Sequence, residues 1–306
     1  MLDVIIIGGA PAGLTAAIYT SREQLNTLVL EQAQCGGMPA TTDLLENYPG
    51  FPEGINGTEL IAKFKAQALK FGTDINEDQQ VRKVSVKEAV ITVETQKQSF
   101  KTKALIAASG SIPKPLNLPG EEKFRGRGVS YCATCDGPLF RDRDIAVIGC
   151  GNSGLQEGEH LLKFARSVTF VEFLPEMTAA KILQERLAKQ PQVKFLLNHQ
   201  LTAINGQAMV DSITVKERQS GQEKQIAVTG VFIYAGFLPN SKFLQGLVEM
   251  DQLGYVKTDQ DLQTKTPGIY AAGDVRSKKV RQITTACGEG TVAAISARDY
   301  IRQRCQ

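Results

Sequence analysis

The sequence has no long run of basic residues and no apolar stretch that would serve as a membrane span. Its 35 Lys and Arg residues are interleaved with 32 Asp and Glu residues, and no basic run reaches the length of a nucleic-acid footprint. The apolar N-terminal stretch lacks a basic leader and a small-residue cleavage site, and glycines interrupt it. We therefore expect no nucleic-acid partner and no membrane insertion.

Cysteine and histidine are also scarce. Six cysteines in 306 residues are far below the density of a disulfide scaffold, which predicts a reducing, cytoplasmic setting. Only Cys132 and Cys135 lie close together, within YCATCDG. Structural zinc needs four ligands, but there is no second CxxC pair, and His160 and His199 stand alone in the sequence. We therefore expect no metal site.

The CATC pair has three interpretations: zinc ligands, a structural disulfide or a redox couple. Zinc lacks further ligands, and a reducing compartment disfavours a structural disulfide. A two-residue spacer lets one thiolate attack a disulfide while the other resolves the intermediate, so a redox pair fits best. Asp136 follows Cys135 directly. It is either a proton donor to the leaving thiolate or a loop acid that caps the next turn.

The N-terminal segment predicts a dinucleotide-binding βαβ unit. Residues 3–7 form a β-branched run, and Gly8 and Gly13 precede a small-residue helix that extends to about Ser21. A second strand ends in Glu31, 23 residues after Gly8. Such a glycine turn lets a pyrophosphate approach the backbone at a helix N-terminus, and the acid accepts the ribose hydroxyls.

A second copy of this pattern begins near residue 144. Gly149, Gly151 and Gly154 have the full GxGxxG spacing, and Glu172 ends the next strand 23 residues after Gly149. A single match is weak evidence, because glycine-rich turns are common. Two copies with the same offsets, each between a predicted strand and a predicted helix, indicate two nucleotide sites.

The order of the segments predicts an α/β fold with two Rossmann-like dinucleotide-binding domains, the second inserted into a discontinuous first domain. The C-terminal segment has too little surface for a core of its own, so it completes the first domain. Proline-rich residues after 112 and the stretch GFLPNS at 236–241 are the predicted connections. We therefore predict domain segments 1–114, 115–241 and 242–306.

Six motifs, in this order and spacing, carry a resemblance over essentially the whole chain: GGAPAGLTAAIY, ENYPGFP, CATCDGPLF, GCGNSG, AAGDV and RQITTA. The chain resembles the low-molecular-weight thioredoxin reductases, a branch of the flavoproteins with two dinucleotide-binding domains. The resemblance implies that the first domain holds FAD. The implied FAD residues are Gly8, Ala10, Pro11, Ala12, Gly13, Glu31, Gly37, Asn47, Gly273, Asp274, Arg281, Gln282 and Ile283.

The resemblance also implies catalytic roles. Cys135 would receive electrons from the flavin, Cys132 would attack the disulfide of a thioredoxin-like protein, and Asp136 would supply a proton. Members of the family rotate one domain against the other, which predicts hinges near 113–119 and 236–241. The family is typically dimeric, so we expect a homodimer.

The sequence departs from the family at the second nucleotide site. That site is predicted at Gly149, Gly151, Asn152, Ser153, Gly154 and Glu172. NADPH-dependent members continue with HRRxxxR, which holds the 2′-phosphate, but here residues 171–179 read VEFLPEMTA. Glu172 would repel a phosphate and Phe173 offers it no hydrogen bond. We therefore expect a donor other than NADPH.

A free ribose diol suits Glu172, which admits NADH or the adenosine half of a second FAD. The loss of HRRxxxR also resembles the ferredoxin-dependent flavin thioredoxin reductases. A ferredoxin is acidic and would need a basic docking surface, and RSKKVR at 276–281 is the one dense basic cluster. The alternative for this cluster is a solvated loop.

The sequence therefore predicts an FAD-dependent, thioredoxin-disulfide reductase-like enzyme that draws electrons from NADH or ferredoxin. Two alternatives remain. One has a target other than thioredoxin, and the other is a diflavin electron-relay protein with a second FAD in the nucleotide site.

Overall fold

The computed structural model describes residues 1–304 and divides the chain into two units. The first unit comprises Met1–Ala40, Leu44–Ile112 and the chain from Leu238 onward. The second comprises Pro113–Phe237 and the short segment Thr41–Asp43. The division differs from the predicted boundaries at three places, because residues 41–43 and 113–114 fall in the second unit and residues 238–241 in the first.

The first unit contains a seven-stranded sheet in the order β3-β2-β1-β6-β5-β4, with β17 also paired to β6. Strand β6 pairs along one edge with antiparallel β5 over its first half and with parallel β17 over its second half. The strands are β1 (Leu2–Ile7), β2 (Thr27–Leu30), β3 (Asp74–Asn76), β4 (Val81–Lys87), β5 (Val90–Thr95), β6 (Ser99–Ala107) and β17 (Ile269–Ala271).

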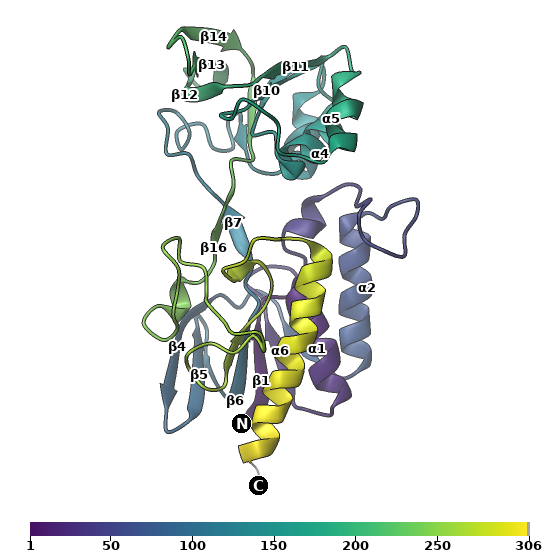
Figure 1. Cartoon of the computed structure of the whole chain (residues 1–306), viewed down its shortest axis with the longest axis vertical. Helices are drawn as coiled ribbons and strands as arrows, with labels where there is room; N and C mark the ends of the chain where they lie inside the picture. The colour runs from purple at the N-terminus through teal and green to yellow at the C-terminus, as the bar shows by residue number, and fades with distance from the viewer. Residues whose placement is uncertain (305–306) are drawn as a thin grey trace. The chain divides into compact units, whose positions relative to one another are not determined.

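Three helices cover one face of this sheet (Figure 1): α1 (Pro11–Arg22), α2 (Gly57–Lys70) and α6 (Ile283–Arg304). Small residues let α1 and α6 approach closely, since a Cβ at Gly290 would lie only 2.2 Å from the carbonyl oxygen of Ala12. Single-turn 3₁₀ helices complete the unit: η1 (Met38–Thr41), η3 (Lys242–Leu244) and η4 (Gly273–Val275).

The β-branched run of β1 is buried on both faces of the sheet. Val4 and Ile6 pack beneath the helices, whereas Ile5 and Ile7 pack on the opposite face with residues that include Leu244. A strand covered on both sides has no solvent-facing positions, which explains why its residues are continuously apolar rather than alternating with polar ones.

The second unit is built on a five-stranded parallel sheet in the order β11-β10-β9-β15-β8. The strands are β8 (Val129–Ser130), β9 (Asp144–Ile148), β10 (Ser167–Val171), β11 (Val193–Leu196) and β15 (Gly230–Ile233). Apolar residues of α4 (Asn152–Leu161) and α5 (Lys181–Ala188) pack on one face. The antiparallel sheet of β12 (His199–Gly206), β13 (Val210–Glu217) and β14 (Glu223–Ala227) packs on the other.

Two adjacent strands carry the chain between the units. β7 (Ser111–Pro113) pairs with β16 (Phe237–Pro239) in a two-stranded sheet. The backbone N–H of Lys114 donates to the carbonyl of Gly236 at 3.0 Å, so the two passages stay side by side beyond the strands. The remaining elements, α3 (Ala133–Asp136) and η2 (Gly137–Phe140), follow β8. Within residues 1–304, no helix is both long and apolar enough to cross a membrane.

The predicted α/β class is confirmed, with a parallel βαβ arrangement at the start of each unit. Strand β1 pairs in parallel with β2 around α1, and β9 pairs in parallel with β10 around α4. The carboxyl ends of these strands are where parallel sheets place their ligands.

Candidate active site and nucleotide sites

The two glycine turns have nearly identical geometry. Gly8 and Gly149 have φ angles of +110° and +107°, a conformation that side chains other than glycine adopt only with strain. A Cβ at Gly13 would lie 1.8 Å from the Gly8 carbonyl oxygen, and one at Gly154 would lie 2.0 Å from that of Gly149. The helix therefore starts directly against the turn in each unit, which leaves the first helical N–H groups for an anionic ligand.

The acids at the strand ends are anchored in the same way. Glu31 accepts a hydrogen bond from the backbone N–H of Gly9 at 2.8 Å, and Glu172 accepts one from that of Cys150 at 2.6 Å. Each carboxylate also accepts the N–H two residues later, at 3.1 Å and 2.9 Å respectively. A carboxylate has about four lone-pair positions, so each acid keeps acceptor capacity for a ribose hydroxyl.

Residues far apart in the sequence surround the first glycine turn. A Cβ at Gly37 would lie 2.9 Å from the Cβ of Ala10, and one at Gly273 would lie 2.9 Å from the Cβ of Ala12. Both glycines have positive φ angles, +60° and +78°, so the backbone passes close to the turn at two further points. Pro11 occupies the first position of α1, where its missing N–H costs nothing.

A small hollow lies beside this turn, within the first unit. Its lining includes Gly8, Glu31, Gln79, Ser109, Asn240 and Phe243. The predicted phosphate-binding turn and the predicted ribose acid therefore open onto the same cavity.

A second group of predicted residues gathers at the start of α6. Asn47 donates through Nδ2 to Oε1 of Gln282 at 3.1 Å, and Gln282 directly precedes Ile283, the first residue of the helix. Arg281 stacks its guanidinium over the ring of Tyr255, 4.3 Å from the centroid. The sequence prediction assigned Asn47, Arg281 and Gln282 to one group. Tyr255 belongs to no motif, so the sequence did not reveal its contact with Arg281.

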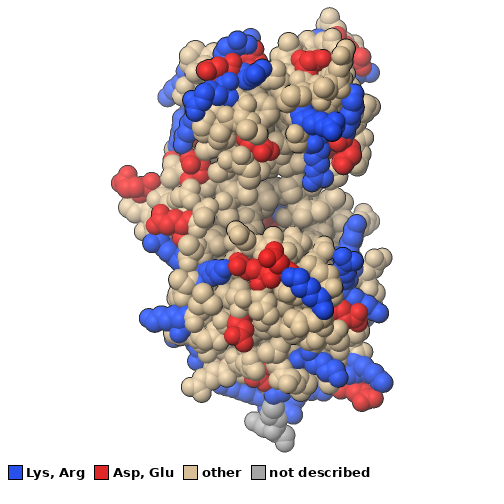
Figure 2. Space-filling model, turned by 180° about the vertical axis from the view of Figure 1, so that it is seen from behind, with Lys and Arg blue, Asp and Glu red and all other residues tan. Residues whose placement is uncertain are grey.

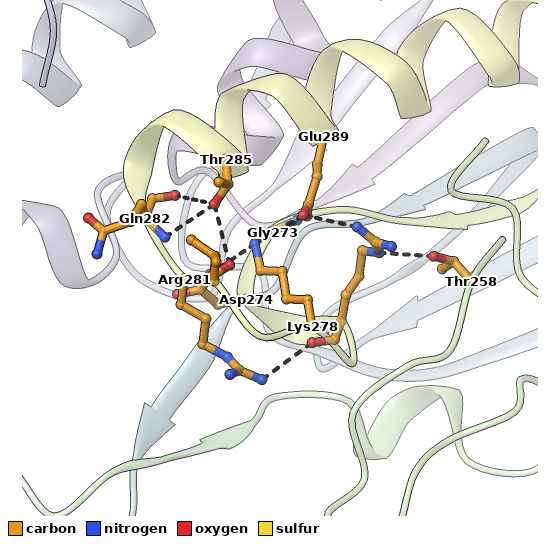
Figure 3. Close-up of polar contacts among 10 residues, drawn as sticks. Thr258, Gly273, Asp274, Lys278, Arg281, Gln282, Thr285 and Glu289 are labelled. Carbon is orange, nitrogen blue, oxygen red and sulfur yellow. Dashed lines mark hydrogen bonds and ion pairs between the residues drawn. The ribbon is translucent and has the colours of Figure 1, made fainter. Parts of the chain in front are cut away.

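Asp274 pairs with Lys278 in a polar cluster that centres on Glu289 (Figure 3). Burial raises the pKa of the Asp274 carboxyl group, and its Oδ1 accepts no hydrogen bond, although Lys278 Nζ lies 3.3 Å away. The Nε atom of Arg281 is also buried without a hydrogen-bond partner. Buried polar atoms are normally satisfied, so these two atoms indicate a polar ligand in this region.

Two of the four basic side chains in the cluster RSKKVR are largely buried. Arg276 and Lys278 have side chains only 14% and 10% exposed, and both pair with Glu289, at 2.9 Å and 3.2 Å. Glu289 also accepts the backbone N–H of Gly273 at 2.7 Å (Figure 3). Both expectations for this segment, a docking surface and a solvated loop, are therefore wrong for these two cations, while Lys279 is exposed.

Opposite charges are mixed on one face of the molecule. Figure 2 shows one face of the molecule, on which Lys and Arg side chains are interspersed with Asp and Glu. No broad basic patch occupies this face.

Cys132 and Cys135 form a disulfide, with Cα atoms 5.4 Å apart, a spacing typical of such bonds. Cys132 is the N-cap of α3, and its Sγ accepts the backbone N–H of Cys135 at 3.2 Å. Within residues 1–304, no group of three His, Cys, Asp or Glu side chains is arranged to hold a metal ion.

Asp136 is held beside the disulfide by Ser130. The Ser130 hydroxyl donates to Oδ2 of Asp136 at 2.6 Å and accepts the backbone N–H of Cys132 at 3.0 Å. One side chain therefore links the acid to the first cysteine. Sequence reasoning missed Ser130, and its only signal was its position two residues before Cys132.

The other end of α3 is anchored by Tyr234, which follows β15. Its hydroxyl accepts the backbone N–H of Ala133 at 3.0 Å, and burial raises the pKa of the phenol. Burial also raises the pKa of Glu157 on α4, to about 7. Tyr234 is distant from CATC in the sequence and belongs to no motif, so only the fold reveals this contact.

A protein-family model described as pyridine nucleotide-disulphide oxidoreductase matches residues 2–290. The chain belongs to this family. The thioredoxin reductase of Mycolicibacterium smegmatis is 43% identical to this pyridine nucleotide-disulphide oxidoreductase over 303 residues, which cover 99% of the chain and 97% of the relative.

Solved structures agree. The Lactococcus lactis thioredoxin reductase in its FR conformation superposes with a TM-score of 0.97 at 38% identity, covering 99% of this chain and 100% of the other. The T. acidophilum thioredoxin reductase has a TM-score of 0.94 at 34% identity, covering 100% and 99%. This family member is therefore an oxidoreductase, of the flavin disulfide reductase type.

The thioredoxin reductase family binds FAD, and the first unit of this family member fits that group. A glycine turn and an anchored acid open onto one cavity, and Asp274 and Arg281 have buried polar atoms without hydrogen-bond partners. The dinucleotide would supply phosphates for the turn and hydroxyl groups for the acids.

Proposed function

We propose that this enzyme reduces the disulfide of a thioredoxin-like protein through Cys132 and Cys135. The observation that carries the proposal is the disulfide on α3, with Asp136 held beside it by Ser130. It is supported by the similarity to thioredoxin reductases over nearly the whole chain.

The chemistry divides between the two units. Reduced FAD in the first unit would supply the two electrons that break the bond between Cys132 and Cys135, and two protons taken up with them would leave two thiol groups. We propose that Cys135 is the cysteine that accepts these electrons. The connections near 113–119 and 236–241 would act as hinges that let the CATC pair serve the flavin and the protein substrate in turn.

Disulfide exchange then returns the pair to its oxidised form. The Cys132 thiolate attacks one sulfur of the partner's disulfide, which forms a mixed disulfide and releases one partner thiolate. Asp136 supplies the proton that this thiolate takes up. The Cys135 thiol then loses its proton and attacks the sulfur of Cys132, which re-forms the internal disulfide and releases the second partner sulfur, and this sulfur takes up that proton to become a thiol.

The electron donor is proposed to be NADH or a ferredoxin rather than NADPH. Glu172 is 8% exposed and lies against the second glycine turn, so a 2′-phosphate bound there would meet a buried anion. We therefore propose that the enzyme belongs to a branch of the family that lacks the NADPH motif. A ferredoxin would have to dock without the RSKKVR side chains that face Glu289.

A second candidate function is favoured by the equivalence of the two nucleotide sites. Glu31 and Glu172 make the same pair of backbone contacts, which suits the same diol in both units. A second FAD in the second unit would make the protein a diflavin disulfide oxidoreductase or electron relay with a target other than thioredoxin.

One experiment separates these functions. Flavin released from the purified protein is counted, and the enzyme is then titrated anaerobically with NADPH, NADH and reduced ferredoxin while flavin absorbance is followed. We expect rapid reduction by NADH or ferredoxin, and rapid bleaching by micromolar NADPH would overturn the donor assignment. A flavin ratio near two favours the second candidate, whereas a ratio near one rules it out.

The protein target is tested by turnover with thioredoxin and with low-molecular-weight disulfides. Preference for the small disulfide would contradict the proposed target.

We also propose that the enzyme acts as a cytoplasmic homodimer, and sedimentation equilibrium of the holoenzyme tests its oligomeric state.

A further inference from the structure

A guanidinium from a distant hairpin lies on the aromatic residue that follows the second ribose acid. Arg218, between β13 and β14, is centred 3.8 Å from the centroid of the Phe173 ring. Its Nη1 donates to the carbonyl oxygen of Phe173 at 3.1 Å. Phe173 nevertheless remains 48% exposed, so part of its ring is accessible to a ligand.

Local hydrogen bonds hold this stacked pair in place. The backbone N–H of Arg218 donates to the carbonyl of Asn198 at 3.0 Å, and the Asn198 N–H donates to that of Leu174 at 2.8 Å. The side chain of Asn198 donates to Oε1 of Glu217 at 2.8 Å. The hairpin is therefore fastened to the turn at 172–174, and the guanidinium is ordered before any ligand arrives.

The stacked pair is next to the group that would recognise a ribose. Glu172 Oε1 accepts the backbone N–H of Leu174 at 2.9 Å, so the carboxylate lies over the same turn that carries Phe173. In an adenosine, the base and the diol are attached to one sugar ring. A ligand whose diol reaches Glu172 therefore has its base close to this turn.

We propose that Phe173 and Arg218 form a stacking platform for the adenine of a nucleotide with a free ribose diol, and that they determine the specificity of the second site. This inference rests on the proposed function, since it names the ligand class of that site. An aromatic ring and a planar cation can both stack on a purine. In nucleic-acid binding, such stacking tolerates any base because every base has a π-face.

The surroundings favour a base over a 2′-phosphate. Arg218 already donates to the Phe173 carbonyl, and its guanidinium carbon lies 3.8 Å from the ring centroid, so these contacts engage the cation before a bidentate phosphate clamp could form. Glu172 adds a negative charge at the position where a 2′-phosphate would have to sit. NADH and FAD both present the required adenosine, so they are two sources of one chemistry.

The test measures binding to the oxidised holoenzyme by calorimetry, with 5′-AMP and 2′,5′-ADP as probes. We expect 5′-AMP to bind more tightly than 2′,5′-ADP. Phe173→Ala and Arg218→Ala should each weaken 5′-AMP about tenfold, the loss expected for one stacking contact, whereas Phe173→Tyr should retain wild-type affinity. Arg22→Ala is the matched control, because Arg22 stacks over the half-exposed Phe71 in the first unit.

If a second FAD fills the site, the same variants are compared by counting the adenine nucleotide released on denaturation. The wild type would then release two per chain, and Phe173→Ala would release fewer. Circular dichroism and thermal melting establish that each variant folds.

Two results would overturn the proposal. One is unchanged affinity and nucleotide content in both alanine variants. The other is tighter binding of 2′,5′-ADP that Arg218→Ala abolishes, which would make Arg218 a phosphate ligand. Thioredoxin reduction by photoreduced wild-type enzyme needs no nucleotide donor, so it tests the proposed function separately.

Discussion

Replacing Asp136 by Asn removes the proposed proton donor while preserving its position. The amide oxygen of Asn can still accept the hydrogen bond that Ser130 donates at 2.6 Å, so the local geometry should be retained. General acid–base catalysis by a positioned side chain typically contributes about 10²–10⁴-fold. We therefore expect thioredoxin turnover to fall at least about 100-fold, with normal flavin content.

A second variant separates the proton from its positioning. Ser130→Ala leaves the acid but removes the hydrogen bond that positions it, and a typical hydrogen bond is worth about 0.5–1.5 kcal/mol. We expect a loss of about 5–10-fold, the equivalent of roughly 1 kcal/mol in the rate.

Stopped-flow reduction of thioredoxin by the prereduced enzyme provides the assay. The disulfide of each oxidised variant is verified by thiol counting, so that a slow rate is not caused by a missing cysteine pair. If Asp136→Asn stays within threefold of the wild type, Asp136 is a structural cap and the reasoning is refuted.

Three further predictions concern backbone geometry and charge. Gly13→Ala should abolish FAD retention, since the new Cβ would lie 1.8 Å from the Gly8 carbonyl oxygen; normal flavin content would contradict this tight contact between helix and turn. Gly236→Ala places a side chain at a φ of +102° in the connection at 236–241, which costs about 1–3 kcal/mol. We expect this variant to have a lower kcat and normal flavin content. An unchanged kcat would argue against a hinge at this connection. Hydrogen bonds from Arg166 and Ser167 lower the pKa of Asp144 to about 2. The stability that these bonds provide is therefore fully present above the pKa of this carboxyl group in the unfolded chain, near 4. It is lost as the pH falls toward 2. Asp144→Asn should therefore lower the melting temperature at pH 7 by about 2–4 °C, after allowance for exposure, with little effect near pH 2. Equal shifts at both pH values would exclude this linkage.

The sequence alone was sufficient to predict the parts that depend on local chemistry. Gly8 and Gly149 mark turns whose positive φ angles few other residues adopt, and Glu31 and Glu172 follow at a fixed offset because strand and helix lengths set it. The α/β class followed from these repeats. CATC indicated its own pairing because a two-residue spacer within one helical turn brings both sulfurs together.

Only the tertiary structure decided which side chains from different segments meet. Ser130 and Tyr234 reach α3 from the ends of two neighbouring parallel strands, β8 and β15, which lie about a hundred residues apart in the chain. RSKKVR read as a basic surface, but Arg276 and Lys278 point inward because α6 presents Glu289 to them.

The same reason applies to the second predicted nucleotide site. VEFLPEM contains no basic residue, so this segment by itself offers no cation for a 2′-phosphate. The hairpin that follows β13 brings Arg218 onto Phe173 from forty-five residues away. Local patterns record the backbone conformation and the chemistry of one segment, whereas contacts between segments depend on sheet order and register, which no single segment encodes.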